Sequence, residues 1–315
     1  MRRWIVCLGF FLAACAGAAP LPPKAIELND QGTLALAEGD LETASARFEV
    51  ALEYNPHFVE ALTNLGLVEL QRGNFTRART LLARARRLNP DVAQPHHGLG
   101  VLEERRGRPD RASKHYQEAL AVDPGFAPAR ANLARLYFNA GQFERARSQF
   151  KRLTEVAPEE PQGFTGLCES LLSLGRNTEA DAISQRALRR FGPEPELLIL
   201  EARRSLRKGR PAHAIELLLP LSTGEDDYAA AALSWIATAE LARNRPAHAV
   251  GAAKRSLELA PDGAVAIYCL ALGLHALDDP AAVAWLERAE RLEPGRPLIR
   301  AALAEEHARS QATRH

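Results

Sequence analysis

Histidines and carboxylates are the residue types in this chain that could most readily do chemistry, and their spacing argues against a reactive site. His96 and His97 are adjacent, and neighbouring residues on a helix point in different directions, so they form a poor pair of metal ligands. His213 and His248 recur in the matching phrases RPAHAI and RPAHAV, which favours a duplicated surface histidine over a weak metal pair. No cysteine or histidine spacing typical of zinc is present.

Catalytic motifs are also missing from the sequence. It contains no Gly-rich phosphate loop, no Gly-x-Ser-x-Gly and no His-Glu-x-x-His. The adjacent acids Glu103-Glu104 and Asp226-Asp227 are typical of a helix face and a loop. We therefore expect no enzyme, no metal and no cofactor. An enzyme would need a polar pocket in the irregular stretch from Ser222 to Asp227.

The first twenty residues, MRRWIVCLGFFLAACAGAAP, have the pattern of an export signal. Arg2 and Arg3 precede an apolar run from Trp4 to Ala14, and small residues follow. The run is about half the roughly 20 residues that span a bilayer as a helix. We therefore predict that this stretch targets the chain for export from the cytoplasm.

The end of this signal, Leu12-Ala13-Ala14-Cys15, resembles the bacterial lipobox. The resemblance implies a signal peptide over residues 1–14, cleavage before Cys15 and a diacylglycerol on its thiol, with residues 15–24 as lipidated cysteine and linker. Ala16 after the cysteine implies sorting to the outer membrane, facing the periplasm. The alternative is ordinary cleavage after Ala16-Gly17-Ala18, which would leave a soluble periplasmic protein.

Composition indicates a folded, helical protein that does not bind nucleic acid. The 315 residues are 46% hydrophobic and 25% charged, as in globular proteins, and runs that alternate Val, Ile and Thr are absent. The stretch from Arg72 to Pro90 is rich in arginine, yet 40 basic residues face 39 acidic ones overall. Aromatic residues make up only 6%, too few for a series of base-stacking platforms.

Residues of the same type recur every 34 positions, which indicates an internal repeat. Glycine ends a helix at little conformational cost, proline stops the next helix, and alanine lets two helices approach closely. The recurring glycines are Gly39, Gly73, Gly107, Gly141, Gly175 and Gly209. The recurring alanines are Ala44, Ala78, Ala112, Ala146, Ala180 and Ala214, and the prolines are Pro56, Pro90, Pro124 and Pro158.

Two helices fit between these markers, and the pattern resembles the tetratricopeptide repeat. The resemblance implies an all-α, right-handed superhelical solenoid of about eight helix pairs and a C-terminal capping helix. Five units that match well begin near residues 25, 59, 93, 127 and 161 and occupy residues 25–194. Three divergent units, near 195, 230 and 264, occupy residues 195–295, and residues 296–315 would form the cap and tail.

The repeat explains the arginine-rich stretch and the two remaining cysteines. The arginines between Arg77 and Arg87 alternate with apolar residues and so lie on the outer face of a helix, where their stems cover apolar surface. Cys168 stands where other units have glycine, which favours a close-packed role. Cys269 is about three repeats away, too far for a disulfide.

In the tetratricopeptide family the first helices line a concave groove, chiefly through positions 2, 5, 9, 12 and 13 of each unit. Carried onto this chain, the groove would be apolar with scattered arginines, suited to an amphipathic helix or an extended peptide. Several of its leucines could instead simply pack between repeats. The predicted groove residues are Leu36, Leu67, Leu70, His97, Val101, Glu104, Arg135, Phe138, Leu172, Arg203, Leu206 and Leu241.

The combined expectation is a non-enzymatic scaffold: an outer-membrane lipoprotein that docks another envelope protein or peptide segment in its groove. A lipid anchor followed by tandem repeats resembles the lipoproteins that help to assemble type IV pilus secretins. The alternative is a soluble periplasmic sensor or regulator whose array binds a small ligand or a glycan.

Overall fold

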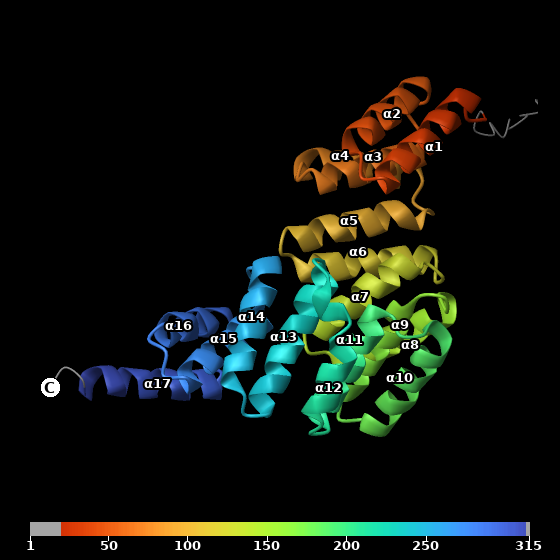
Figure 1. The fold of residues 1–315 in the computed structure, drawn as a ribbon. Helices are drawn as coiled ribbons and strands as arrows, with labels where there is room; N and C mark the ends of the chain where they lie inside the picture. Colours follow the sequence, from red (N-terminus) through yellow and green to blue (C-terminus); the bar gives the residue numbers. More distant parts are fainter. Residues whose placement is uncertain (1–19, 313–315) are drawn as a thin grey trace, which may run out of the picture. The chain divides into compact units, whose positions relative to one another are not determined.

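The described part of the chain, residues 20–312 of a computed structural model, is entirely helical. It contains 17 α-helices and one short 3₁₀ helix, with no strand among these residues (Figure 1). The predicted all-α fold class is therefore confirmed. Cys15 and the export signal lie outside the described residues.

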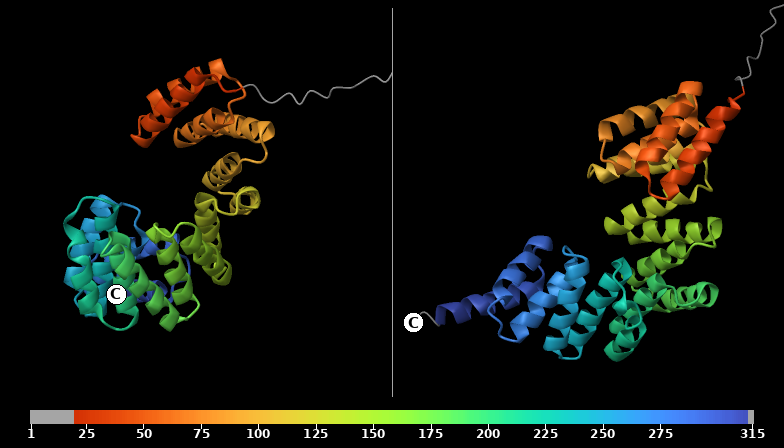
Figure 2. Two further views of the ribbon diagram at one scale, coloured as in Figure 1. Left: turned by 90° about the vertical axis from the view of Figure 1, so that its right-hand side faces the viewer. Right: turned by 45° about the horizontal axis from the view of Figure 1, so that its top comes forward.

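The chain divides into two compact units, residues 1–133 and 134–315, with the boundary inside helix α7 (Ala127–Asn139). In the first unit, successive helices form antiparallel hairpins, as Figures 1 and 2 show. The helices of this unit that come before α7 are α1 (Pro23–Ala37), α2 (Leu41–Tyr54), α3 (Val59–Gln71), α4 (Phe75–Leu88), α5 (Ala93–Arg105) and α6 (Pro109–Val122).

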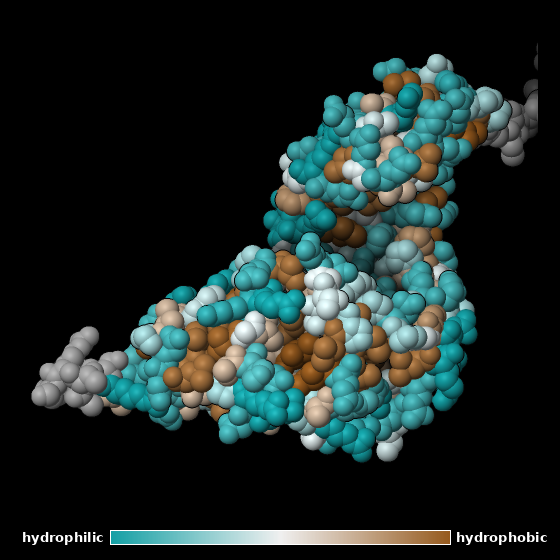
Figure 3. Space-filling view, viewed as in Figure 1, coloured by the Kyte–Doolittle hydropathy of each residue, from teal (hydrophilic) through white to brown (hydrophobic). Residues whose placement is uncertain are grey.

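The second unit continues the same alternation of first and second helices. Its helices are α8 (Phe143–Val156), α9 (Pro161–Ser173), α10 (Asn177–Phe191), α11 (Pro195–Arg207), α12 (Pro211–Leu218), η1 (Leu221–Thr223), α13 (Asp227–Ala242), α14 (Pro246–Leu259), α15 (Ala264–Ala276), α16 (Ala282–Leu292) and α17 (Pro297–Ala312). On the face shown in Figure 3, hydrophobic residues gather over α13 and α15.

Helix starts follow the predicted repeat with one clear exception. Helices α3, α5 and α9 begin at Val59, Ala93 and Pro161, where the 34-residue register places them. The exception is α13, which begins at Asp227 because the Asp226 side chain accepts a hydrogen bond from the Ala229 amide at 2.8 Å and caps the helix. Asp227 therefore lies in a helix, and the expected loop at Asp226-Asp227 is shorter than predicted.

The recurring glycines end the first helices in the left-handed backbone conformation. Gly73, for example, has φ +80°, and its amide donates to the Leu70 carbonyl at 3.1 Å. In the last two pairs the same turn is made by Asn244 (φ 57°) and Asp278 (φ 55°), two residue types that tolerate this conformation. The turn is thus conserved in shape where the glycine is lost.

In the helix pairs of the first unit, a glycine of the first helix packs directly against one bulky side chain of the second helix. A Cβ added to Gly32 would come 2.7 Å from the Phe48 ring, and one added to Gly100 would come 2.4 Å from the Tyr116 ring. Both rings are fully buried. Only a residue without a side chain lets the two helices approach this closely.

Cys168 and Cys269 are both buried, in agreement with the packing role predicted for Cys168. The Cys168 thiol faces the Ala180 carbonyl at 3.4 Å, and burial raises its pKa to about 12. Burial likewise raises the pKa of Cys269 to about 11. Neither thiol forms a thiolate near neutral pH, so neither is a candidate nucleophile.

Within residues 20–312, every helix is too short or too polar to cross a membrane.

The glycine contact predicts opposite effects for two glycine-to-alanine substitutions. Gly100→Ala should lower the free energy of unfolding by about 1–3 kcal/mol, because the buried Tyr116 ring must move. Gly251→Ala should raise it by about 0.5–1 kcal/mol, because Gly251 lies inside α14 and an added Cβ there meets nothing within 4 Å. Denaturant unfolding followed by circular dichroism measures both. A Gly100→Ala protein as stable as the wild type would contradict this account of the packing.

Candidate interaction grooves

Several predicted groove residues turn out to serve the packing between helices. Leu70 is 2% exposed and lies in the core beside Leu82 and Leu99, so it offers no surface to a partner. Four other leucines and the valine are partly buried against neighbouring hydrophobic cores. They are Leu36, Leu67, Val101, Leu206 and Leu241.

His97 and Glu104 are engaged in a partly buried aromatic cluster. The imidazole of His97 lies 5.7 Å from the Tyr116 ring and 5.5 Å from the Phe126 ring, centroid to centroid. The Asn132 amide Nδ2 donates to His97 Nε2 at 3.0 Å, and the Tyr116 hydroxyl donates to Glu104 at 2.9 Å. Burial lowers the pKa of His97 to about 4, despite the opposing charge of Glu104. The imidazole is therefore neutral at pH 7.

The predicted residues of the second unit differ in how far they reach solvent. Arg135 is exposed, and Phe138 is half-buried with its ring edge-on to Phe143 at 5.4 Å. Leu172 lines a small hollow of about 120 Å³ with charged neighbours. Arg203 forms an ion pair with Glu169 and lies over the Trp235 ring at 5.0 Å.

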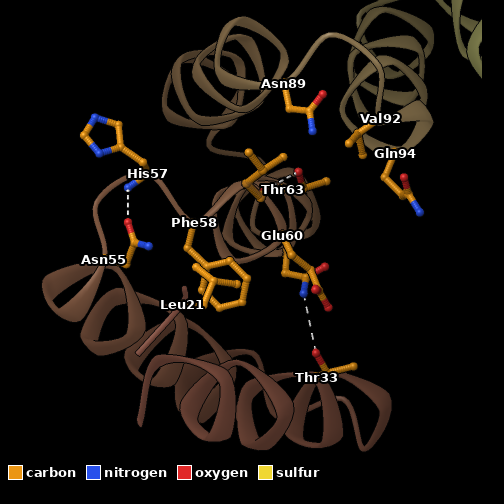
Figure 4. Close-up of a pocket in the computed structure, with 12 residues that line it drawn as sticks. Leu21, Thr33, Asn55, His57, Phe58, Glu60, Thr63, Asn89, Val92 and Gln94 are labelled. Carbon is orange, nitrogen blue, oxygen red and sulfur yellow. Dashed lines mark hydrogen bonds between the residues drawn. The ribbon is translucent and has the colours of Figure 1, made fainter. Parts of the chain in front are cut away.

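The first unit carries a hollow of about 960 Å³, here called the N-terminal groove. It is formed by the chain before α1, by the first helices α1, α3 and α5, and by the turns that precede α3 and α5 (Figure 4). The lining residues are Leu21, Thr33, Asn55, His57, Phe58, Val59, Glu60, Thr63, Asn64, Asn89, Val92 and Gln94.

Side-chain amides dominate the polar lining of the N-terminal groove. Buried Asn29 donates to Glu60 at 3.0 Å and accepts from the Asn64 amide at 3.1 Å, so the one carboxylate of the lining is already engaged. Asn55 accepts from the His57 backbone at 2.9 Å and Asn89 from the Asp91 backbone at 3.1 Å. Amides can donate to and accept from a polypeptide backbone at once, which suits an extended segment.

The second unit carries a hollow of about 630 Å³, here called the acidic groove. It is formed by side chains along the first helices α9 and α11 and by the N-terminal part of α13. The lining residues are Glu160, Pro161, Gln162, Thr165, Glu169, Glu196, Ile199, Leu200, Arg203, Asp227, Tyr228 and Ala231. The predicted character of the groove, apolar with scattered arginines, therefore does not describe this part of the chain.

Arg203 is the one predicted groove residue that lines either groove, and most of the other lining residues stand at positions of the repeat that the sequence prediction did not carry forward residue by residue. Lining residues such as Glu60, Gln94 and Glu196 stand at position 2 of their units, and Thr63, Thr165 and Ile199 stand at position 5. The signal was present in the family pattern. Position 12, from which seven residues were taken, is the position at which the first helix packs on its partners.

No group of three or more His, Cys, Asp or Glu side chains that could hold a metal occurs among the described residues. The hollows combine amides, hydroxyls, carboxylates, one guanidinium and apolar side chains.

Sequence models of the tetratricopeptide repeat match residues 29–93, 66–132 and 105–167. Residues 29–167, less than half of the chain, therefore match the tetratricopeptide repeat in sequence, and the helix pairs that follow keep the same architecture. Proteins of this type are generally non-enzymatic scaffolds that bind peptides or proteins in a groove. A comparison with curated proteins finds no match.

Solved structures share the solenoid fold at low sequence identity. A tetratricopeptide repeat protein from Parabacteroides merdae is 19% identical with a TM-score of 0.63, over 80% of this chain and all of that one. A chain of the APC/C hetero-tetramer Cut9-Hcn1 is 17% identical with a TM-score of 0.67, over 88% of this chain and 55% of that one. The type IV pilus biogenesis factor PilW is 22% identical with a TM-score of 0.56, over 64% of this chain and 94% of that one.

The environment of His97 predicts that the protein loses stability in mild acid. Its folded pKa of about 4 lies below the unfolded value of about 6.5, so protons bind the unfolded chain first. The contribution of His97 is fully present above pH 6.5 and is lost as the pH falls toward 4, by up to about 3 kcal/mol. Unfolding free energies of wild type and His97→Gln between pH 7.5 and 4 should converge as the pH falls. A constant difference across this range would refute the assignment.

Proposed function

We propose that the chain is a non-enzymatic scaffold that holds an extended segment of an envelope protein in its grooves. The observation that carries this proposal is the N-terminal groove, whose 960 Å³ hollow combines backbone-binding amides with the apolar side chains of Leu21, Val59 and Val92. Open hollows of this kind, formed on successive first helices, suit a polypeptide better than a small substrate.

The proposed address is the periplasmic side of the outer membrane, with a lipid on Cys15. This part rests on the resemblance of residues 12–15 to the lipobox. Six steps along the chain lead from Cys15 to Leu21, a residue of the N-terminal groove, and they extend at most about 20 Å. A lipid at Cys15 would thus hold this groove near the membrane surface, where a partner anchored in the same membrane is within reach.

The assembly of a secretin or of a related type IV pilus complex is the setting that we propose for this scaffold. It is supported by the combination of a lipobox with tandem repeats and by the fold shared with PilW. The soluble periplasmic sensor remains the alternative outcome of the first experiment below.

The lipid anchor predicts a change of compartment when the acceptor thiol is removed. The wild-type chain should sediment with outer membranes, whereas Cys15→Ser should be lost from them, because the serine hydroxyl does not accept the diacylglycerol. Density-gradient fractionation with immunodetection measures both. A wild-type chain found wholly in the soluble periplasmic fraction would overturn the anchor and leave the soluble sensor.

The N-terminal groove predicts a site-specific crosslink. A photo-crosslinking amino acid at Gln94, exposed in the groove, should give a discrete protein adduct in living cells. The same amino acid at Thr80, exposed on the second helix α4, is the matched control and should give none. Equal adducts from the two positions, or none from Gln94, would contradict docking in this groove.

A further inference from the structure

We propose that the acidic groove of the second unit binds a cationic segment of the partner polypeptide, in which lysine or arginine side chains alternate with apolar ones. This inference rests on the proposed scaffold function and adds the chemical class of the segment that the second unit takes. Three observations support it: the net negative charge of the lining, the ion pair that already engages its single arginine, and its apolar floor.

The acidic groove contains four carboxylates and one guanidinium. The carboxylates are Glu160, Glu169, Glu196 and Asp227, and the guanidinium is Arg203. Three separate helices supply the acids: Glu160 is the N-cap residue of α9, Glu169 lies further along α9, and Glu196 and Asp227 lie in the first turns of α11 and α13. Residues remote in the sequence are thus brought to one hollow.

Arg203 does not neutralise the groove as a whole. It is ion-paired with Glu169 and lies over the Trp235 ring, so its charge is already used. Glu160, Glu196 and Asp227 are left as an exposed acidic rim. Glu196 accepts a hydrogen bond from the Tyr228 hydroxyl at 2.7 Å, and this contact raises the pKa of Tyr228.

Stabilisation of helix ends does not by itself account for this rim. Acidic residues in the first turn of a helix interact favourably with its dipole, and the effect would apply to any helix. Yet α9 has no acid in its first turn, and Glu169 lies too far along this helix to interact with its N-terminal dipole. In the N-terminal groove the only carboxylate is Glu60, and it is engaged by Asn29. Four carboxylates thus line the acidic groove and one lines the N-terminal groove, so the two grooves differ in charge.

The apolar floor of the groove is the reason for proposing apolar side chains in the bound segment. Ile199 and Ala231 are partly exposed, Pro161 lies beside them, and Leu200 closes the base at 2% exposure. Lysine and arginine lay their apolar stems along such surfaces while their charged ends reach carboxylates at the rim. A divalent cation alone would leave the floor uncovered, and an anionic lipid headgroup would be repelled by the rim.

The test measures binding of a synthetic peptide with the repeating sequence Leu-Lys-Ala, about nine residues long, to the full chain purified in detergent. Fluorescence anisotropy should show saturable binding that weakens as salt is raised, because exposed charge pairs are screened. The counterpart with Glu in place of Lys should not bind. In the variant Glu160→Gln/Glu196→Gln/Asp227→Asn, affinity for the lysine peptide should fall about tenfold.

The matched control removes three acids of the second unit that do not line the acidic groove. Glu216→Gln/Glu258→Gln/Asp262→Asn should bind the lysine peptide like the wild type, with circular dichroism confirming that both variants are folded. The salt dependence of binding is measured on the wild-type chain alone, so this part of the test does not depend on whether a variant folds. Equal loss in both variants, equal binding of both peptides, or no binding of the lysine peptide would overturn the inference. A crosslink from Gln94 that persists in such a case would leave the scaffold function standing.

Discussion

A glycine against a bulky side chain is the contact on which the helix pairs depend. Phe48, Leu82 and Tyr116 stand at the same place in successive second helices, and Gly32, Gly66 and Gly100 face them from the first helices. Leu82 is also pressed by Gly98 of the next pair, where an added Cβ would lie 2.7 Å away. The Leu82 side chain thus packs against glycines of its own helix pair and of the following one. The distance between these two pairs therefore depends on the absence of a Cβ at both glycines. Any widening of this contact would open a void in the core.

The grooves follow from the same packing. Because each first helix turns its packing residues toward the second helices, the positions near its N-terminal end remain free for solvent or a partner. The N-terminal groove fills these positions with asparagine, threonine and glutamine, and the acidic groove fills them with glutamate and aspartate. One backbone arrangement therefore presents two different chemistries, and selectivity depends on side chains that stability does not constrain.

The helices could be predicted from the sequence, whereas the residues of the grooves could not, and the difference has a physical reason. Glycine and proline act on their own stretch of backbone, so the starts of α3, α5 and α9 could be read from spacing alone. Groove residues are defined by what they do not touch, and a leucine such as Leu70 looks the same whether it faces a core or a partner. The acidic rim was hidden because its members are dozens of residues apart in a chain whose charges nearly cancel. Only the fold brings them together.

The left-handed turns have a consequence for how such an array can diverge. A Cβ added at Gly73, Gly141 or Gly209 meets nothing within 4 Å, so these turns need a backbone shape and no particular neighbour. Asn244 and Asp278 meet the same need. The helix pairs continue to Leu292 past these two turns, so the architecture does not require glycine at this position of the repeat. In this array, the conformation of the turn is kept at positions where the residue type differs.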